Sequence, residues 1–306
     1  MDERNRLAQR FQEHRPHLRA VAYRMLGSTT EADDALQEAW VRLSRSNASE
    51  IDNLKAWLVT VVGRVALNML RSRKRRREEP LEAHLLPDPI VVERAEGGID
   101  DPEHEALLSD SVGLALLVVL ETLTPAERLA YVLHDMFSVP FEEIGAILNR
   151  SPEAARQLAS RARRRIRSAH TTTPHYSAEA AAHQQEEVVE AFLAAARDGD
   201  FDALLAVLDP EIVERVDTGS GTILEVRGAH NVARRAMAAA SQRDGLVGRP
   251  ALINGAAGWV SVLDGELYAI CALTVQGGRI TTMDILLDPA RLAGLDLSAD
   301  YFDSRL

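Results

Sequence analysis

The sequence Asp34-Ala35-Leu36-Gln37-Glu38-Ala39-Trp40 and the stretch from Phe141 to Ile166 are the most informative parts of this 306-residue chain. The first predicts an amphipathic helix, capped by a hydroxyl side chain among residues 28–30. Its buried stripe is expected to consist of Ala35, Leu36, Ala39 and Leu43. Residues at helical spacing on another face are Asp34, Gln37, Glu38 and Val41. By spacing alone that polar face could be merely solvated.

The second stretch predicts a helix-turn-helix. One helix begins near Phe141, Asn149 and Arg150 turn the chain, and Ser151 caps a helix that opens at Pro152. The side chains expected to point inward are Ala155, Leu158, Ala162 and Ile166. The candidate base or near-base contacts are Arg156, Gln157, Ser160 and Arg161, with Arg164 on the same outer face. Arg164 and the other late arginines, Arg163, Arg165 and Arg167, are expected to contact phosphates, which position the helix without reading sequence.

The charge is strongly segmented, although its net value is −11. Residues 1–80 carry 16 Lys and Arg against 11 Asp and Glu, and residues 150–176 carry 7 against 1. Residues 81–149 and 177–306 are acidic. Two basic segments in an acidic chain favour binding to a phosphate backbone at two places.

A further helix is predicted from Leu54 to about Arg73, ending in the cationic run 71–77. One of its faces combines an aromatic ring, a hydroxyl, an amide and two guanidinium groups. That face consists of Trp57, Thr60, Arg64, Asn68 and Arg71. Such a surface suits unpaired DNA, in which bases stack and phosphates meet cations. Trp57 could also simply be a core residue.

Taken in this order, these segments resemble regions 2 and 4 of extracytoplasmic-function sigma factors. The string D-A-x-Q-E-x-[FW] is similar to the surface that grips the coiled coil of the polymerase β′ subunit, and L-x-x-L-T-P-x-E-R around Thr124 is typical of region 4. The resemblance implies core polymerase (β′ coiled coil and β flap) and promoter DNA as partners. It assigns the Asp34 face to polymerase, the Trp57 face to the −10 element and the Arg156 helix to the −35 element.

Residues 177–306 are not part of a minimal sigma factor. Their opening, Val188 to Pro210, resembles a SnoaL-like domain of the nuclear-transport-factor-2-like superfamily, a cone of helices on a curved antiparallel sheet. The sequence predicts a helix at 229–242 and strands at 212–216, 251–254, 258–263, 266–275 and 279–287. The expected fold is therefore multidomain, with two all-α domains and one α+β domain.

A subfamily of these sigma factors carries such a C-terminal domain in a regulatory role. Leu85-Leu86-Pro87-Asp88-Pro89 resembles its linker motif W-L-P-E-P, with Leu85 replacing tryptophan. Asp217-Thr218-Gly219-Ser220-Gly221 and Asp288-Pro289-Ala290-Arg291-Leu292 resemble altered forms of its D-G-G-G-K and N-P-D-K-L motifs. The interdomain residues that the resemblance implies are Pro87, Asp88, Pro89, Asp217, Gly219, Gly221, Asp288, Pro289 and Arg291. A structureless proline turn remains the alternative for the linker.

Two other classes of protein stay open at this point. The first is an isomerase- or hydrolase-like enzyme, since relatives of the cone hold an Asp or His acid/base pair, for which Asp217, Asp284 and His230 are candidates. The second is a one-component repressor, which would leave the Asp34 and Trp57 faces unexplained. A small ligand in the cone stays open as a partner under the sigma factor reading as well.

The expected domains are residues 1–77, a linker at 78–105, residues 106–170 and residues 177–306. With Cys271 as the only cysteine, a polar N-terminus and no apolar run of membrane-spanning length, we expect a cytoplasmic protein that does not enter a membrane. No histidine cluster suggests a metal, and neither a cofactor nor a catalytic residue is expected. We expect a monomer in the free state.

Overall fold

The computed structural model describes residues 3–46, 51–76, 86–92, 113–169, 178–243, 245–295 and 297. The chain divides into two compact units. The first consists of residues 1–81, 100–110 and 117–171, and the second of residues 82–99, 111–116 and 172–306. Some of the predictions concern residues outside these ranges. They involve Leu85, residues 93–112 and the run 74–77, of which only the helical backbone at 74–76 is described.

The first unit begins with three long helices, α1 (Glu3–Leu26), α2 (Thr29–Arg45) and α3 (Leu54–Arg76). Ser28 caps α2 by accepting a hydrogen bond from the Glu31 backbone N–H. The expected stripe of α2 is buried, with Ala32 added to it. Helix α3 buries Leu58, Val62 and Ala66 as predicted, whereas Met69 is half-buried.

The later helices are α5 (Leu114–Glu121), α6 (Pro125–Tyr131), the π-helical turn η2 (Val132–Met136), α7 (Phe141–Leu148) and α8 (Pro152–Ala169). Thr124 and Glu127 form a reciprocal capping box at the start of α6. Asn149 adopts the left-handed conformation that ends α7, and Ser151 accepts a hydrogen bond from the Ala154 N–H at the start of α8. The predicted helix-turn-helix is confirmed.

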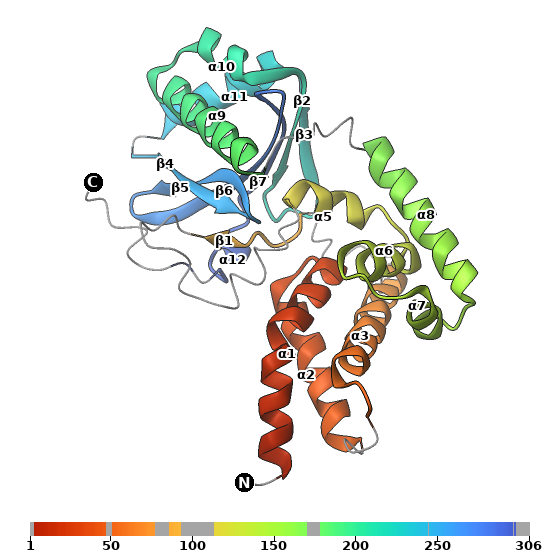
Figure 1. The fold of residues 1–306 in the computed structure, drawn as a ribbon. Helices are drawn as coiled ribbons and strands as arrows, with labels where there is room; N and C mark the ends of the chain where they lie inside the picture. Colours follow the sequence, from red (N-terminus) through yellow and green to blue (C-terminus); the bar gives the residue numbers. More distant parts are fainter. Residues whose placement is uncertain are drawn as a thin grey trace. The chain divides into compact units, whose positions relative to one another are not determined.

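The second unit is built on a seven-stranded sheet in the order β1-β4-β5-β6-β7-β2-β3 (Figure 1). Neighbouring strands are antiparallel except β2 and β7, which are parallel. The strands are β1 (Val91–Val92), β2 (Leu208–Asp217), β3 (Ile223–Arg227), β4 (Val247–Ile253), β5 (Ala256–Leu263), β6 (Glu266–Gln276) and β7 (Arg279–Leu286).

Helices α9 (Ala178–Asp198), α10 (Phe201–Val207) and α11 (Ala229–Gln242) gather beside this sheet, and α12 (Pro289–Leu292) follows β7 (Figure 1). The apolar side chains of α9, α10 and α11 form a core with the sheet, in which Phe192 of α9 stacks on Trp259 of β5 with ring centroids 5.1 Å apart. The predicted α+β cone is confirmed. Strands β1 and β3 were not predicted.

No helix in the described part of the chain combines the length and apolarity needed to cross a membrane.

Candidate polymerase and promoter interfaces and the linker clamp

The polar face of α2 is available at the surface. Asp34, Gln37 and Glu38 are exposed and Val41 is half-buried. Glu38 accepts a hydrogen bond from Arg42 at 2.9 Å, one turn further along the helix. Neighbouring Asp33 is instead held by Arg19 of α1 at 3.2 Å. The structure therefore places the four predicted polymerase-binding residues together on one helix.

A hollow lies at the start of α3. Its volume is about 490 Å³, and Trp57 and Thr60 line it together with Ile51, Asp52 and Asn53. Asn53 also caps the helix by accepting from the Ala56 N–H at 3.1 Å. The other predicted −10 residues, Arg64, Asn68 and Arg71, are exposed further along α3.

Arg73 has a different position from the one expected for a phosphate-binding run. Its Nε donates to Glu31 at 3.0 Å and its Nη1 donates to the Leu26 carbonyl at 3.0 Å. This side chain therefore ties the end of α3 to the corner between α1 and α2. The prediction treated the whole run 71–77 as cationic tail, because the sequence does not reveal such tertiary partners.

Helix α8 separates cleanly into two faces. Ala155, Leu158 and Ala162 are buried and Ile166 is half-buried, with Ala159 as a further buried residue. The five predicted −35 residues, Arg156, Gln157, Ser160, Arg161 and Arg164, are all exposed. This is the division that a recognition helix requires.

Glu127 of α6 fixes part of that cationic surface. Its buried carboxylate pairs with Arg161 at 3.3 Å and with Arg165 at 2.9 Å. Burial raises the pKa of the Glu127 carboxyl, but hydrogen bonds from Thr124 and the charges of Arg165 and Arg161 outweigh it and hold the pKa below its ordinary value. Arg161 is thus oriented by Glu127 while about half of its side chain stays exposed.

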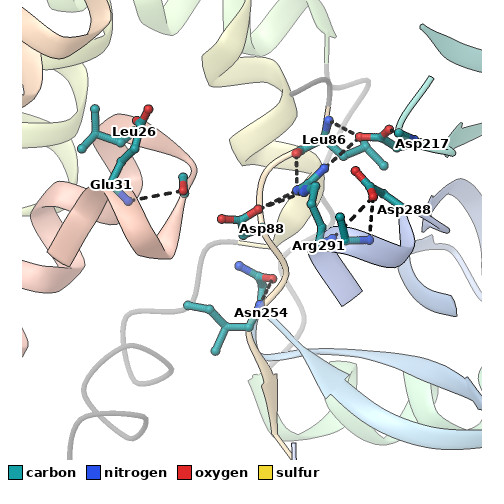
Figure 2. Close-up of polar contacts among 12 residues, drawn as sticks. Leu26, Glu31, Leu86, Asp88, Asp217, Asn254, Asp288 and Arg291 are labelled. Atoms are coloured by element: carbon teal, nitrogen blue, oxygen red, sulfur yellow. Dashed lines mark hydrogen bonds and ion pairs between the residues drawn. The ribbon is translucent and has the colours of Figure 1, made fainter. Parts of the chain in front are cut away.

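In the second unit, Arg291 of α12 clamps the segment 86–92 onto the C-terminal domain (Figure 2). Its Nη2 donates to Asp88 Oδ1 and to the Leu86 carbonyl, each at 2.7 Å. Its Nη1 donates to Asp217 Oδ2 at 2.9 Å. The Arg291 side chain is only 9% exposed, so these bonds are largely shielded from water.

Asp217, at the end of β2, holds the same segment from the other side. Its Oδ2 accepts from the Leu86 N–H at 3.2 Å, and its Oδ1 accepts from the Gly219 N–H at 3.0 Å. Gly219 has φ +77°, and an added Cβ would lie 2.7 Å from Cγ of Asp288. Asp288 in turn caps α12 by accepting from Ala290 at 2.9 Å. Because Gly219 has no side chain, the carboxylates of Asp217 and Asp288 can both lie close to the backbone of this turn.

The far end of the segment is held by backbone pairing. The side-chain oxygen of Asn254 accepts a hydrogen bond from the Ile90 backbone N–H at 3.0 Å. The backbone N–H of Asn254 donates to the Ile90 carbonyl at 2.7 Å. Val91 and Val92 then pair antiparallel with Ile253 and Leu252. The segment thereby extends the sheet by one short strand, a form of β-augmentation.

These contacts contradict the alternative of a structureless proline turn and leave one assigned residue without support. Residues 86–92 lie against the sheet, where Pro87 and Pro89 are buried and Asp88 is half-buried. Gly221, assigned to the same interdomain group, has open space around a Cβ added to it. Its φ of +81° explains the glycine as a turn residue. Asn254, Leu86 and Ile90 were not identified, because their roles depend on pairing between distant segments.

The three acid/base candidates do not converge. Asp217 belongs to the clamp, Asp284 is paired with Arg215 at 2.6 Å, and His230 is exposed with its ring edge-on to Phe201. The interior contains the Phe192–Trp259 stack. A cavity between α9 and strands β4 and β5 has a volume of only about 10 Å³, room for about one water molecule. Among the described residues no group of His, Cys, Asp or Glu could hold a metal ion.

Comparison with known proteins agrees with this architecture. Residues 10–76 match the family described as Sigma-70 region 2, and residues 113–166 match Sigma-70, region 4. These regions define a protein of the sigma-70 class. The chain is 33% identical over 293 residues to probable ECF RNA polymerase sigma factor SigI of Mycobacterium tuberculosis, covering 95% of this chain and 97% of that protein.

It is also 35% identical over 302 residues to ECF RNA polymerase sigma factor SigJ of the same organism, covering 94% of this chain and 93% of that protein. The crystal structure of SigJ superposes with a TM-score of 0.73 at 31% identity, over 95% of this chain and 100% of that one. The chain belongs to the extracytoplasmic-function sigma factor family.

Proposed function

We propose that this sigma factor docks on the β′ coiled coil of core RNA polymerase through Asp34, Gln37, Glu38 and Val41. Region 2 (residues 10–76) then holds the −10 element at the hollow beside Trp57 and Thr60, and region 4 (residues 113–166) reads the −35 element with α8. The exposure of all five predicted contact residues on α8, above a buried stripe, is the observation that carries most weight. Monomeric, cytoplasmic and non-enzymatic behaviour belongs to the same proposal.

Within this proposal the C-terminal domain is a regulator that acts on the linker between the two sigma regions. Residues 77–85, between α3 and the clamped segment, can span at most about 30 Å when fully extended. Clamping residues 86–92 therefore shortens the tether that would otherwise join region 2 to region 4. Forming or breaking the contacts that hold residues 86–92 therefore changes the range of distances available between region 2 and region 4.

The test is complex formation with bacterial core polymerase, followed by transcription from a promoter selected from random DNA by the resulting holoenzyme. The wild-type chain should bind core and direct initiation from a defined start site. Glu38→Lys should weaken core binding, because it places a cation on the docking face, whereas Glu225→Lys on the exposed edge strand β3 should not. Failure of the wild-type chain to bind core would end the proposal.

A further inference from the structure

The ring of Phe141, the first residue of α7, is fixed by the turn that precedes it. Ser138 has φ +55°, and the Val139 N–H donates to the Leu133 carbonyl at 2.8 Å, so the chain folds back on η2. His134 Nδ1 lies 3.0 Å from the Val139 carbonyl, and the His134 ring stacks on Phe141 with centroids 3.8 Å apart. The Phe141 side chain is therefore packed in place, yet it is half-buried and not enclosed in the core.

Arg156 of α8 lies over this ring. Its guanidinium carbon is 5.3 Å from the centroid of Phe141, within the range of a cation–π contact. Arg156 is exposed and lies in the first half of α8, the part of a recognition helix from which side chains reach base edges. The structure thus joins a candidate base-reading arginine to an aromatic residue on the other helix of the helix-turn-helix.

A cation–π contact differs from an ion pair in what it leaves available. It is made with the positive charge of the guanidinium and requires no hydrogen bond, so the N–H donors can still meet an acceptor. Bidentate recognition of guanine O6 and N7 uses such donors. By contrast, Arg163 donates Nε to Asp135 at 2.6 Å, and Arg165 donates Nη1 to Glu127 at 2.9 Å. The ring holds Arg156 without competing for the groups that a base would bind.

We propose that Phe141 is a positioning residue for recognition of the −35 element, acting through Arg156. An exposed arginine that is already held loses less rotamer freedom when DNA binds. Sequence preference at the base pair that Arg156 reads therefore depends on Phe141. The inference rests on the proposed function, since it concerns how α8 reads DNA, and it adds a residue to the five predicted contacts.

The test is transcription by core polymerase with full-length variants, on the promoter selected by the wild-type holoenzyme and on all single-base changes in its −35 element. Arg156→Ala should relax the preference at one base pair by about tenfold, the scale of a lost bidentate contact. Phe141→Leu should relax the preference at the same base pair by about threefold, the scale of an exposed cation–π contact. Phe141→Tyr keeps a ring and should retain the preference. In the Arg156→Ala background, Phe141→Leu should have no further effect on it.

Ile147→Val is the matched control for stability, because it trims a buried side chain of the same helix. It should lower the melting temperature and leave every base preference unchanged. A phosphate contact would behave differently from a base contact, since its loss lowers output equally on all promoters. Equal loss on all promoters in Phe141→Leu, an unchanged preference at the Arg156 base pair, or further relaxation in the double variant would each overturn the proposal.

The outcomes separate this inference from the proposed function. If the wild-type holoenzyme does not initiate, the sigma activity itself is wrong. If it initiates and Arg156→Ala relaxes one base pair while Phe141→Leu relaxes none, only the positioning role is wrong. If Arg156→Ala relaxes no base pair, both the positioning role and the assignment of Arg156 to a base fail, whereas the sigma activity stands.

Discussion

Arg291 and Asp88 are 203 residues apart in the sequence, yet the guanidinium of one donates to the carboxylate of the other at 2.7 Å. The pair joins helix α12 of the C-terminal domain to the segment between the two sigma regions. Because Asp217 and the Leu86 carbonyl accept from the same guanidinium, a single side chain holds three partners.

Arg291→Ala should lower the free energy of unfolding of the C-terminal domain by about 3 kcal/mol, because it leaves the 5% exposed side chain of Asp217 without its cation. Urea unfolding followed by circular dichroism measures the change. Arg227→Ala removes the exposed pair with Glu225 and should cost less than about 1 kcal/mol. Similar losses in the two variants would show that the clamp contributes no special stability.

Gly219→Ala should destabilise the domain more than Gly221→Ala. Both glycines have positive φ, so an alanine costs about 1–2 kcal/mol of backbone strain at either position. Only at Gly219 would the new Cβ also collide with the Asp288 carboxylate. Thermal unfolding of the two variants measures the difference, and equal melting temperatures would argue against a close approach of Asp288 to this turn.

Glu127 should make part of the protein's stability depend on pH. Because its pKa is lowered in the folded state, its contribution is fully present above the ordinary value of 4.5 and is lost as the pH falls through the folded-state pKa. Glu127→Gln should therefore flatten the decline of the unfolding free energy between about pH 5 and pH 3. Thr124→Ala, which removes the hydroxyl hydrogen bond to this carboxylate, should give an intermediate slope. An unchanged slope in Glu127→Gln would contradict this assignment.

Cys271 should be unreactive in the native protein. The thiol is 4% exposed, and burial, with a smaller effect of the nearby Glu214 charge, raises its pKa, so little thiolate forms at neutral pH. A thiol reagent should modify it only in denaturant, with one equivalent per chain. Rapid modification of the native protein at pH 7 would show that β6 opens readily.

The local parts of the architecture could be predicted from the sequence. The bounds of the helix Ala229–Gln242 and the turn at Asn149 follow from periodicity and from residues with strong conformational preferences. The same reasoning narrowed the cap of α2 to residues 28–30, among which the structure selects Ser28. The polar faces of α2, α3 and α8 were predicted from the same periodicity. Each of these features depends on residues that are close together in the chain.

The remaining features depend on distant partners and could not be predicted in this way. Val91-Val92 is too short to show a strand pattern, and it pairs only because Asn254 aligns Ile90 with the edge of β4. Likewise, Arg73 is one of several arginines in a run. Its hydrogen bond to Glu31 depends on the packing of α3 against the start of α2, which the sequence does not reveal. The motif resemblance did group Asp88, Asp217 and Arg291, but the geometry of their contact required the structure.

The most direct measurement is promoter-specific transcription by core polymerase with the wild-type chain and with Arg291→Ala, each at a concentration that saturates core. We expect both chains to bind core equally well and to start at the same nucleotide, with an output that differs severalfold because the linker is no longer clamped. Equal output at equal occupancy would contradict a regulatory role for the clamp, and absence of initiation by the wild-type chain would contradict the sigma activity itself.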